Sequence, residues 1–307
     1  MDQLLQITDP HEGGLAPETP PDAALRRIVA ECHAELLKHR TVVLLSRRPI
    51  GIHQTRVALR RMRAAFGLFR GAVEGKSEGR RAKALAAEAK WLAGECAAAR
   101  DLQVFLSETL SDVPPVVRRV AGRLARSHLE RARTALSGAR FTAFDRELTA
   151  FVEARLATGG RLDAFGRPLL DLHHAKVERR AHKLDTLDGE RLHRLRIAIK
   201  KLRYAASFLQ PAFASPAFAP GPASDYIDAT VQLQGALGAL NDRAVAARML
   251  ADIALAARPT EDVARPLRSL AKQAVSGDKK RRRKLQRAWK RFRKAERFWR
   301  LQETGRA

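Results

Sequence analysis

The chain has 307 residues and a formal net charge of +25, from 58 Lys and Arg against 33 Asp and Glu. A compact fold with this charge repels itself, which favours a polyanionic partner. The two cysteines do not make a disulfide framework or a four-ligand zinc site. No apolar run approaches the roughly 18 residues of a membrane span, and no signal-peptide pattern is present. We therefore expect a cytoplasmic protein that does not bind membranes.

Residues 1–22 form the first predicted segment, an acidic leader. They contain five acidic residues, four prolines and two glycines, and no Lys or Arg. This composition is typical of disordered chain. We therefore expect the folded part to cover residues 23–302, followed by a short tail at 303–307.

The remainder of the chain is predicted to be all-α. Ala, Leu and Arg dominate, β-branched residues are sparse, and apolar residues recur at three- and four-residue intervals. Clusters of proline and glycine predict breaks between helices near Pro49, at 71–79, at Pro114 and Pro115, at 159–168, at 211–222 and at 259–266.

The first basic helix is predicted at residues 52–70. His53, Arg56, Arg60 and Arg63 fall within about 80° of arc on a helix, and Arg61 lies off this arc. The opposite, apolar side carries Leu59, Met62, Phe66 and Phe69. Residues 53–73 contain no acidic residue, so the arginines repel one another until an external anion arrives. The alternative is an ordinary solvated face, although such faces usually mix charge signs.

A second basic helix, at residues 192–210, repeats the first at an offset of 140. Five of the nineteen aligned positions are identical and six more are conservative. The matching polar residues are His193, Arg196, Lys200, Lys201 and Arg203, and the apolar side carries Leu195, Ile199, Leu202 and Leu209.

The repeat extends beyond these two helices. His33 matches His173 at offset 140, and Leu92, Gly94 and Asp101 match Leu233, Gly235 and Asp242 at offset 141. We predict two similar antiparallel helical bundles, at about 23–158 and 165–302, that arose by internal duplication and are related by a pseudo-two-fold axis. Both basic faces would then lie near the axis and form a basic central groove or pore.

The last predicted helix, at residues 279–300, carries 13 Lys or Arg and one acidic residue. Leu285, Trp289, Phe292 and Trp299 share one face, which favours packing against the core. A membrane-surface helix and a nucleic-acid arm are the alternatives.

The pattern H-x-x-R-x-x-x-[RK]-[RK]-[LM]-R occurs at 53–63 and at 193–203, and each copy is followed by an L-x-G segment that ends in Asp. This doubled motif resembles the CHAD family, the conserved histidine α-helical domain. WKRFRKAERFWR at 289–300 is similar to the closing helix of that family, so the resemblance covers residues 24–302.

The resemblance implies two pseudo-symmetric helical bundles that bind inorganic polyphosphate on a basic central surface. Carried over position by position, the implied polyphosphate-binding residues are His53, Arg56, Arg60, Arg61, Arg63, His193, Arg196, Lys200, Lys201, Arg203 and Tyr204. Two positions depart from the repeat: Ala64 aligns with Tyr204, and Asn241 aligns with Arg100. The second departure suggests that Asp101 and Asp242 matter more than their neighbours.

The roles of the histidines and aspartates are less specific. His53 and His193 each stand alone on a helix face, so they could contact phosphate or form structural hydrogen bonds, whereas a metal site would need a cluster of ligands. Asp101 and Asp242 are interpreted as structural, holding an arginine or capping a helix. We expect no bound metal, no cofactor and no catalytic residue.

Three functions are compatible with this sequence. The leading hypothesis is a non-catalytic polyphosphate-binding module on polyphosphate granules, held by electrostatics and counterion release. The second is a non-specific nucleic-acid-binding protein, although no helix-turn-helix, RRM or zinc-finger pattern is present. An enzyme is the third and least supported, because the chain lacks a Walker loop, a carboxylate set for Mg²⁺ and an E-x-E-x-K motif. The sequence leaves the oligomeric state open.

Overall fold

The computed structural model describes residues 15–46, 48–73, 75–108, 114–154, 159–213, 221–257, 261–275 and 278–303. Within these ranges the chain forms eleven α-helices and no strand, which confirms the predicted all-α class. The first six helices are α1 (Pro21–Leu45), α2 (Pro49–Leu68), α3 (Lys76–Glu95), α4 (Ala97–Glu108), α5 (Pro115–Ser137) and α6 (Ala139–Glu153). The last five are α7 (Leu162–Arg180), α8 (Gly189–Leu209), α9 (Gly221–Ala256), α10 (Glu261–Val275) and α11 (Asp278–Lys294). Four short 3₁₀ helices lie between or after these described helices: η1 (Arg70–Ala72), η2 (Leu184–Thr186), η3 (Gln210–Phe213) and η4 (Phe298–Glu303).

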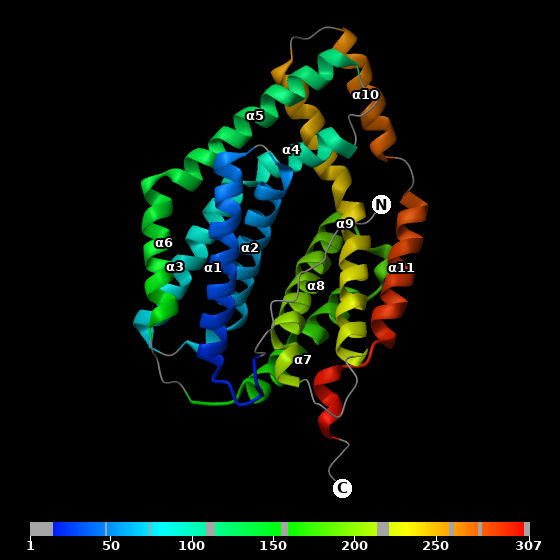
Figure 1. The fold of residues 1–307 in the computed structure, drawn as a ribbon. Coiled ribbons are helices and arrows are strands. Elements are labelled where there is room, and N and C mark those ends of the chain that lie inside the picture. Colours follow the sequence, from blue (N-terminus) through cyan, green and yellow to red (C-terminus); the bar gives the residue numbers. More distant parts are fainter. Residues whose placement is uncertain are drawn as a thin grey trace.

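The helices form two groups that meet in the middle of the molecule (Figure 1). α1, α2, α3 and α6 lie on one side, and α7, α8, α9 and α11 lie on the other. α2 packs against α1 and α3 within its own group and against α8 across the middle. α8 in turn packs against α7 and α9. The two basic helices predicted from the sequence, α2 and α8, are therefore direct neighbours.

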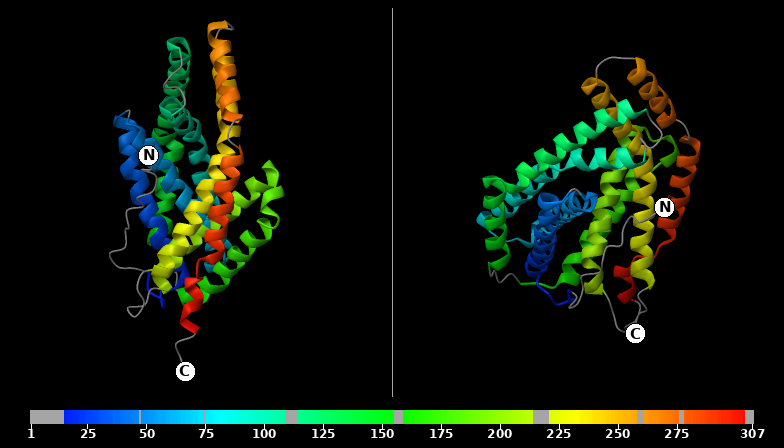
Figure 2. Two further views of the ribbon diagram at one scale, coloured as in Figure 1. Left: turned by 90° about the vertical axis from the view of Figure 1, so that its right-hand side faces the viewer. Right: turned by 45° about the horizontal axis from the view of Figure 1, so that its top comes forward.

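A second, smaller packing unit lies at one end of the molecule. α10, the first part of α5 and the last part of α9 project beyond the two groups of helices (Figure 2). Their contact is apolar, formed with α4 by residues that include Phe105, Val117, Ile253 and Leu267.

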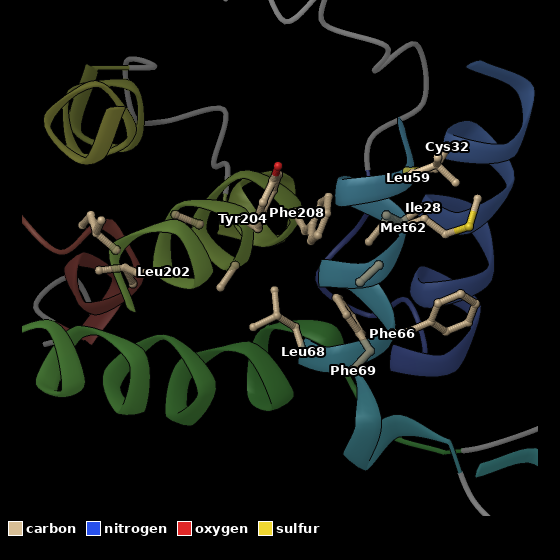
Figure 3. Close-up of a cluster of buried hydrophobic side chains, with 14 of the residues drawn as sticks. Ile28, Cys32, Leu59, Met62, Phe66, Leu68, Phe69, Leu202, Tyr204 and Phe208 are labelled. Atoms are coloured by element: carbon tan, nitrogen blue, oxygen red, sulfur yellow. The ribbon is translucent and has the colours of Figure 1, made fainter. Parts of the chain in front are cut away.

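One continuous hydrophobic core runs through both groups of helices. Its members include the predicted apolar sides of both basic helices, all at most 5% exposed: Leu59, Met62, Phe66, Phe69, Leu195, Ile199, Leu202 and Leu209. Figure 3 shows Phe208 of α8 lying between α8 and α2, beside Tyr204 and facing the apolar side chains of α2. The prediction that each basic helix buries one apolar side is confirmed.

The folded part begins earlier than predicted. Leu15 is 3% exposed and belongs to the core, and α1 already begins at Pro21 with Asp22 buried. Residues 15–22 are thus ordered chain and not part of a disordered leader, because Leu15 packs into the core. Residues 1–14, and 304–307 of the predicted tail, lie outside the described residues.

Prolines mark some helix boundaries but not all of those predicted. Pro49 and Pro115 occupy the first turn of α2 and α5, where the missing N–H costs nothing. Pro168 and Pro266, which were predicted to interrupt helices, lie inside α7 and α10. In α7, burial of flanking residues such as Leu162 and Leu170 outweighs the roughly 3 kcal/mol that an interior proline costs.

The C-terminal segment packs against the core, as its apolar face predicted. Leu285, Phe292 and Trp299 are at most 2% exposed, and Trp289 stacks on Phe292 with ring centroids 5.5 Å apart. The predicted closing helix is interrupted, because α11 ends at Lys294 and η4 begins at Phe298.

Candidate functional site

Cations from α2 and α8 converge where these two helices pack together. Lys200 of α8 is half-buried, and its pKa falls from 10.5 to about 8. Burial is the largest cause, followed by repulsion from Arg196 and Arg203 on its own helix and from Arg60 and Arg63 on α2. Lys200 is therefore surrounded by arginines from both groups of helices. The cation cluster, as we use the term below, consists of Arg56, Arg60, Arg63, Arg196, Lys200 and Arg203.

Arg56 is the member of this cluster that is paired with an acid. Its Nη1 donates to Asp101 Oδ1 at 3.1 Å and to the carbonyl oxygen of Ala97 at 2.6 Å. Burial lowers the pKa of Arg56, while Asp101 opposes that change. α4 thus anchors the arginine at the edge of the cluster, which confirms the structural interpretation of Asp101. The side chain of Asp242, its predicted counterpart, lies outside the described residues.

Arg203 lies deeper than the sequence predicted for a residue on a cation-bearing face. It is 5% exposed, its Nε donates to Gln234 Oε1 of α9 at 3.0 Å, and its guanidinium lies 4.6 Å from the ring centroid of Tyr204. Burial lowers its pKa, with smaller contributions from Arg60 and Arg61. Arg203 therefore supports the cluster from inside the protein and is not an open surface cation.

The other members of the cluster have unused hydrogen-bonding capacity. Among the described residues, no carboxylate forms an ion pair with Arg60, Arg63, Arg196 or Lys200. Arg196 Nε is buried and has no hydrogen-bond partner there. An unpaired buried donor costs about 1–3 kcal/mol. An anion that reached Arg196 would remove this cost.

His53 lies beside the cation cluster as a neutral residue. Its pKa falls from 6.5 to about 4, first because of burial and then because of Arg100, Arg60 and Arg56. At neutral pH its ring can donate one hydrogen bond but adds no positive charge. The pKa of His173 also falls to about 4, from burial and then from Lys201 and Lys176.

Four of the predicted site residues lie outside the cation cluster as defined here, and two of them, Arg61 and Tyr204, still affect Arg203. Lys201 is exposed, and its charge lowers the pKa of His173 of α7. His193 is exposed at the start of α8. Arg61 lies 5.9 Å from the ring centroid of Phe208. Tyr204 is 7% exposed and stacks on Phe208 with ring centroids 5.9 Å apart. Tyr204 is therefore a core residue that supports Arg203.

Two residues that contact or influence the site, Arg100 and Gln234, were not among the predicted site residues. Arg100 is the first charged residue to lower the pKa of His53, and Gln234 holds Arg203. Both lie near residues that the repeat had marked, Asp101 and Leu233. Position next to a repeated residue was the available signal.

The described residues place no three His, Cys, Asp or Glu side chains together as a metal site would need. Cys32 and Cys96 are free and buried, and burial raises the pKa of each thiol to about 12. Of the helices described, none combines the length and the apolar character that spanning a membrane requires.

The geometry defines a class of protein: an all-α fold in which two basic helices, far apart in the chain, pack side by side. The family model of the CHAD domain matches residues 27–251, so the chain belongs to the CHAD domain family. The crystal structure of the CHAD domain from the plant Ricinus communis is similar with a TM-score of 0.77 and 25% identity, over 92% of this chain and 95% of that one.

PptA from Streptomyces chartreusis shares the fold, with a TM-score of 0.63 and 17% identity, over 89% of this chain and 100% of that one. None of the curated proteins matches the sequence.

Proposed function

We propose that this protein is a non-catalytic module that binds inorganic polyphosphate through the cation cluster between α2 and α8. The observation that carries the proposal is the environment of Lys200, whose pKa of about 8 reflects burial among arginines from both basic helices. Charges of one sign held this close repel one another. A chain of phosphates that lay along the cluster would neutralise these charges and remove their repulsion.

The arrangement of the helices supports an origin by duplication. α2 packs against α1 and α3, and α8 packs against α7 and α9, so each basic helix is the second helix of a similar group. Two equivalent basic helices that meet would form one shared binding surface of double the charge. We propose that this surface is the basic groove predicted from the sequence.

Arginine and lysine suit such a ligand for different reasons. The planar guanidinium of arginine can bond two phosphate oxygens at once, and lysine provides a compact charge. Arg60 and Arg63 have no carboxylate partner among the described residues, so the guanidinium groups of both residues are available to phosphate. His53, neutral at neutral pH, would contribute one hydrogen bond.

The decisive experiment compares two double variants that lose the same charge. Arg60→Gln/Lys200→Gln removes two members of the cation cluster, and Lys83→Gln/Lys90→Gln removes two exposed cations of α3. Each lost phosphate contact should lower the salt dependence of binding, as the slope of log K against log[salt], by about 0.7 to 0.9. Titration with long-chain polyphosphate should show this loss for the first variant alone. Equal losses would mean that net charge binds the ligand without a defined site.

A second assay addresses catalysis. Hydrolysis of polyphosphate needs a positioned water and stabilisation of the leaving oxygen, usually by Mg²⁺. We expect no phosphate release from polyphosphate in the presence of Mg²⁺ or Mn²⁺. Release that is lost in an Asp101→Asn variant would identify an enzyme instead.

The proposed cellular site is the polyphosphate granule. A fluorescent fusion of the intact chain should gather on granules, and the Arg60→Gln/Lys200→Gln fusion should spread through the cell. A wild-type fusion that follows the nucleoid in granule-rich cells would favour nucleic acid as the main ligand.

A further inference from the structure

α11 carries a second set of cations on the side of the helix that faces away from the core. Leu285, Ala288 and Phe292 are buried against the core. The opposite side presents an uninterrupted cation ridge of exposed residues, spaced alternately three and four apart: Lys280, Arg283, Arg287, Lys290 and Lys294. These positions fall within about 80° of arc at 100° per residue.

The cation ridge is free to meet a partner. Among the described residues, none of its five side chains forms an ion pair or a hydrogen bond. α11 packs against α9 and η2, and it lies at the edge of the molecule, with its outer side open (Figure 1). Like charges at i,i+3 and i,i+4 destabilise a helix, so the ridge works against the stability of α11.

The helix at the opposite edge of the molecule shows that this position does not require cations. α6 packs on α3 and α1 and mixes charge signs, with Arg140 and Arg146 alternating with Asp145 and Glu147. Arg140 donates two hydrogen bonds to Glu88 of α3, from Nε to Oε2 at 2.8 Å and from Nη2 to Oε1 at 3.1 Å. A balanced outer helix is therefore compatible with the fold, and the cations of α11 need another explanation.

The ridge is also distinct from the cation cluster. α9 lies between α8 and α11 and packs against both. In the side view of Figure 2, α11 lies in front of α9 on the outside of the molecule. A ligand on the outer side of α11 would leave the cation cluster between α2 and α8 accessible.

We propose that the cation ridge of α11 binds the phosphate backbone of duplex nucleic acid, without reading bases, while the cation cluster remains available to polyphosphate. From Lys280 to Lys294 the ridge spans about 21 Å at 1.5 Å per residue, which is the axial rise of about six nucleotides of one strand. A rigid row of cations matches the regular phosphates of a duplex.

Other polyanions match the ridge less well. An anionic membrane surface usually receives an apolar face together with the cations, but the large apolar residues of α11 are turned into the core. Single strands are held by stacking on exposed aromatic rings, and Trp289 is instead packed on Phe292. The ridge offers only charge, which suits backbone contacts alone.

The test measures binding of the intact chain to a fluorescent 20-base-pair duplex over a range of salt concentrations. Lys280→Gln/Arg283→Gln/Arg287→Gln removes three ridge cations. Lys83→Gln/Lys90→Gln/Arg119→Gln is the matched control and removes three exposed cations elsewhere. We expect the ridge variant to bind duplex at least tenfold more weakly, and the slope of log K against log[salt] to be smaller by about three. Its binding of polyphosphate should be unchanged. Duplexes of different sequence should bind alike, and protein with a stoichiometric amount of polyphosphate should still bind duplex.

Three results would overturn the proposal. Equal losses in the ridge and control variants would leave net charge as the cause, and loss of duplex binding in Arg60→Gln/Lys200→Gln with the ridge variant intact would place nucleic acid at the cation cluster. Ridge-dependent binding to phosphatidylserine vesicles, without binding to duplex, would identify a membrane surface. Thermal unfolding of each variant establishes that the fold is retained, and because polyphosphate binding is measured separately, failure here leaves the proposed function untouched.

Discussion

Protonation of Lys200 should accompany polyphosphate binding. In the free protein the pKa of this amine is about 8, against an ordinary value of 10.5, so about half of the molecules are neutral at this position at pH 8. Phosphates that neutralise the surrounding arginines would raise the pKa towards its ordinary value. Binding at pH 8 should therefore take up about half a proton per chain.

The same linkage fixes how affinity depends on pH. The free protein loses the Lys200 proton as pH rises through 8, whereas the bound protein keeps it to a higher pH. Affinity is therefore greatest below pH 8 and falls above it, by about tenfold between pH 7 and pH 9 if the bound pKa returns to its ordinary value.

Isothermal titration calorimetry at pH 8 in buffers of different ionisation enthalpy measures the proton uptake directly. Lys200→Arg is the matched control, because arginine keeps its charge throughout this range. The variant should bind without the half proton and with a flatter pH dependence. Equal proton uptake in the wild type and in Lys200→Arg would refute the assignment of this linkage to Lys200.

Three further outcomes are expected from stability measurements. Asp101→Ala should cost about 1–3 kcal/mol in denaturant unfolding, because it leaves Arg56 without its acid, whereas the exposed Asp228→Ala should change stability by less than about 0.5 kcal/mol; equal changes would contradict the structural role of Asp101. Trp299→Ala should lower the free energy of unfolding by about 3–5 kcal/mol, more than the same change at half-buried Trp289. The reverse order would mean that Trp289, and not Trp299, makes the main core contact of the C-terminal segment. The Tm should fall as pH drops from 6.5 to 4, since the histidines whose folded pKa is about 4 are protonated first in the unfolded chain; a His53→Gln/His173→Gln variant with an equally steep fall would exclude them as the cause.

The sequence predicts the helical class and the inward side of each basic helix because both follow from local periodicity. Leu59 and Met62 recur at helical spacing, and a stripe of that kind must be buried somewhere. Asp101 could be identified because the repeat marks it, and its bond to Arg56 agrees with the structural role given to it.

The depth of each cation could not be predicted in the same way. Arg196 and Arg203 are seven residues apart and share one side of α8, yet Arg203 is 5% exposed and Arg196 is only half-buried. The difference arises from α9, whose Gln234 bonds to Arg203, and periodicity within α8 contains no information about that neighbour. Pro168 failed as a helix boundary for a related reason, since contacts made by the rest of α7 outweigh its local cost.

On the proposed function, the core shared by α2 and α8 would also influence the lifetime of the protein in the cell. Apolar contacts such as that of Phe208 hold together two helices whose charged sides repel each other. On the proposed function, polyphosphate removes this repulsion and stabilises the native state by mass action. Protein without ligand would open more often and be degraded faster, since small changes in stability alter abundance several-fold. The amount of this protein in a cell would then follow the amount of polyphosphate without any change in its synthesis.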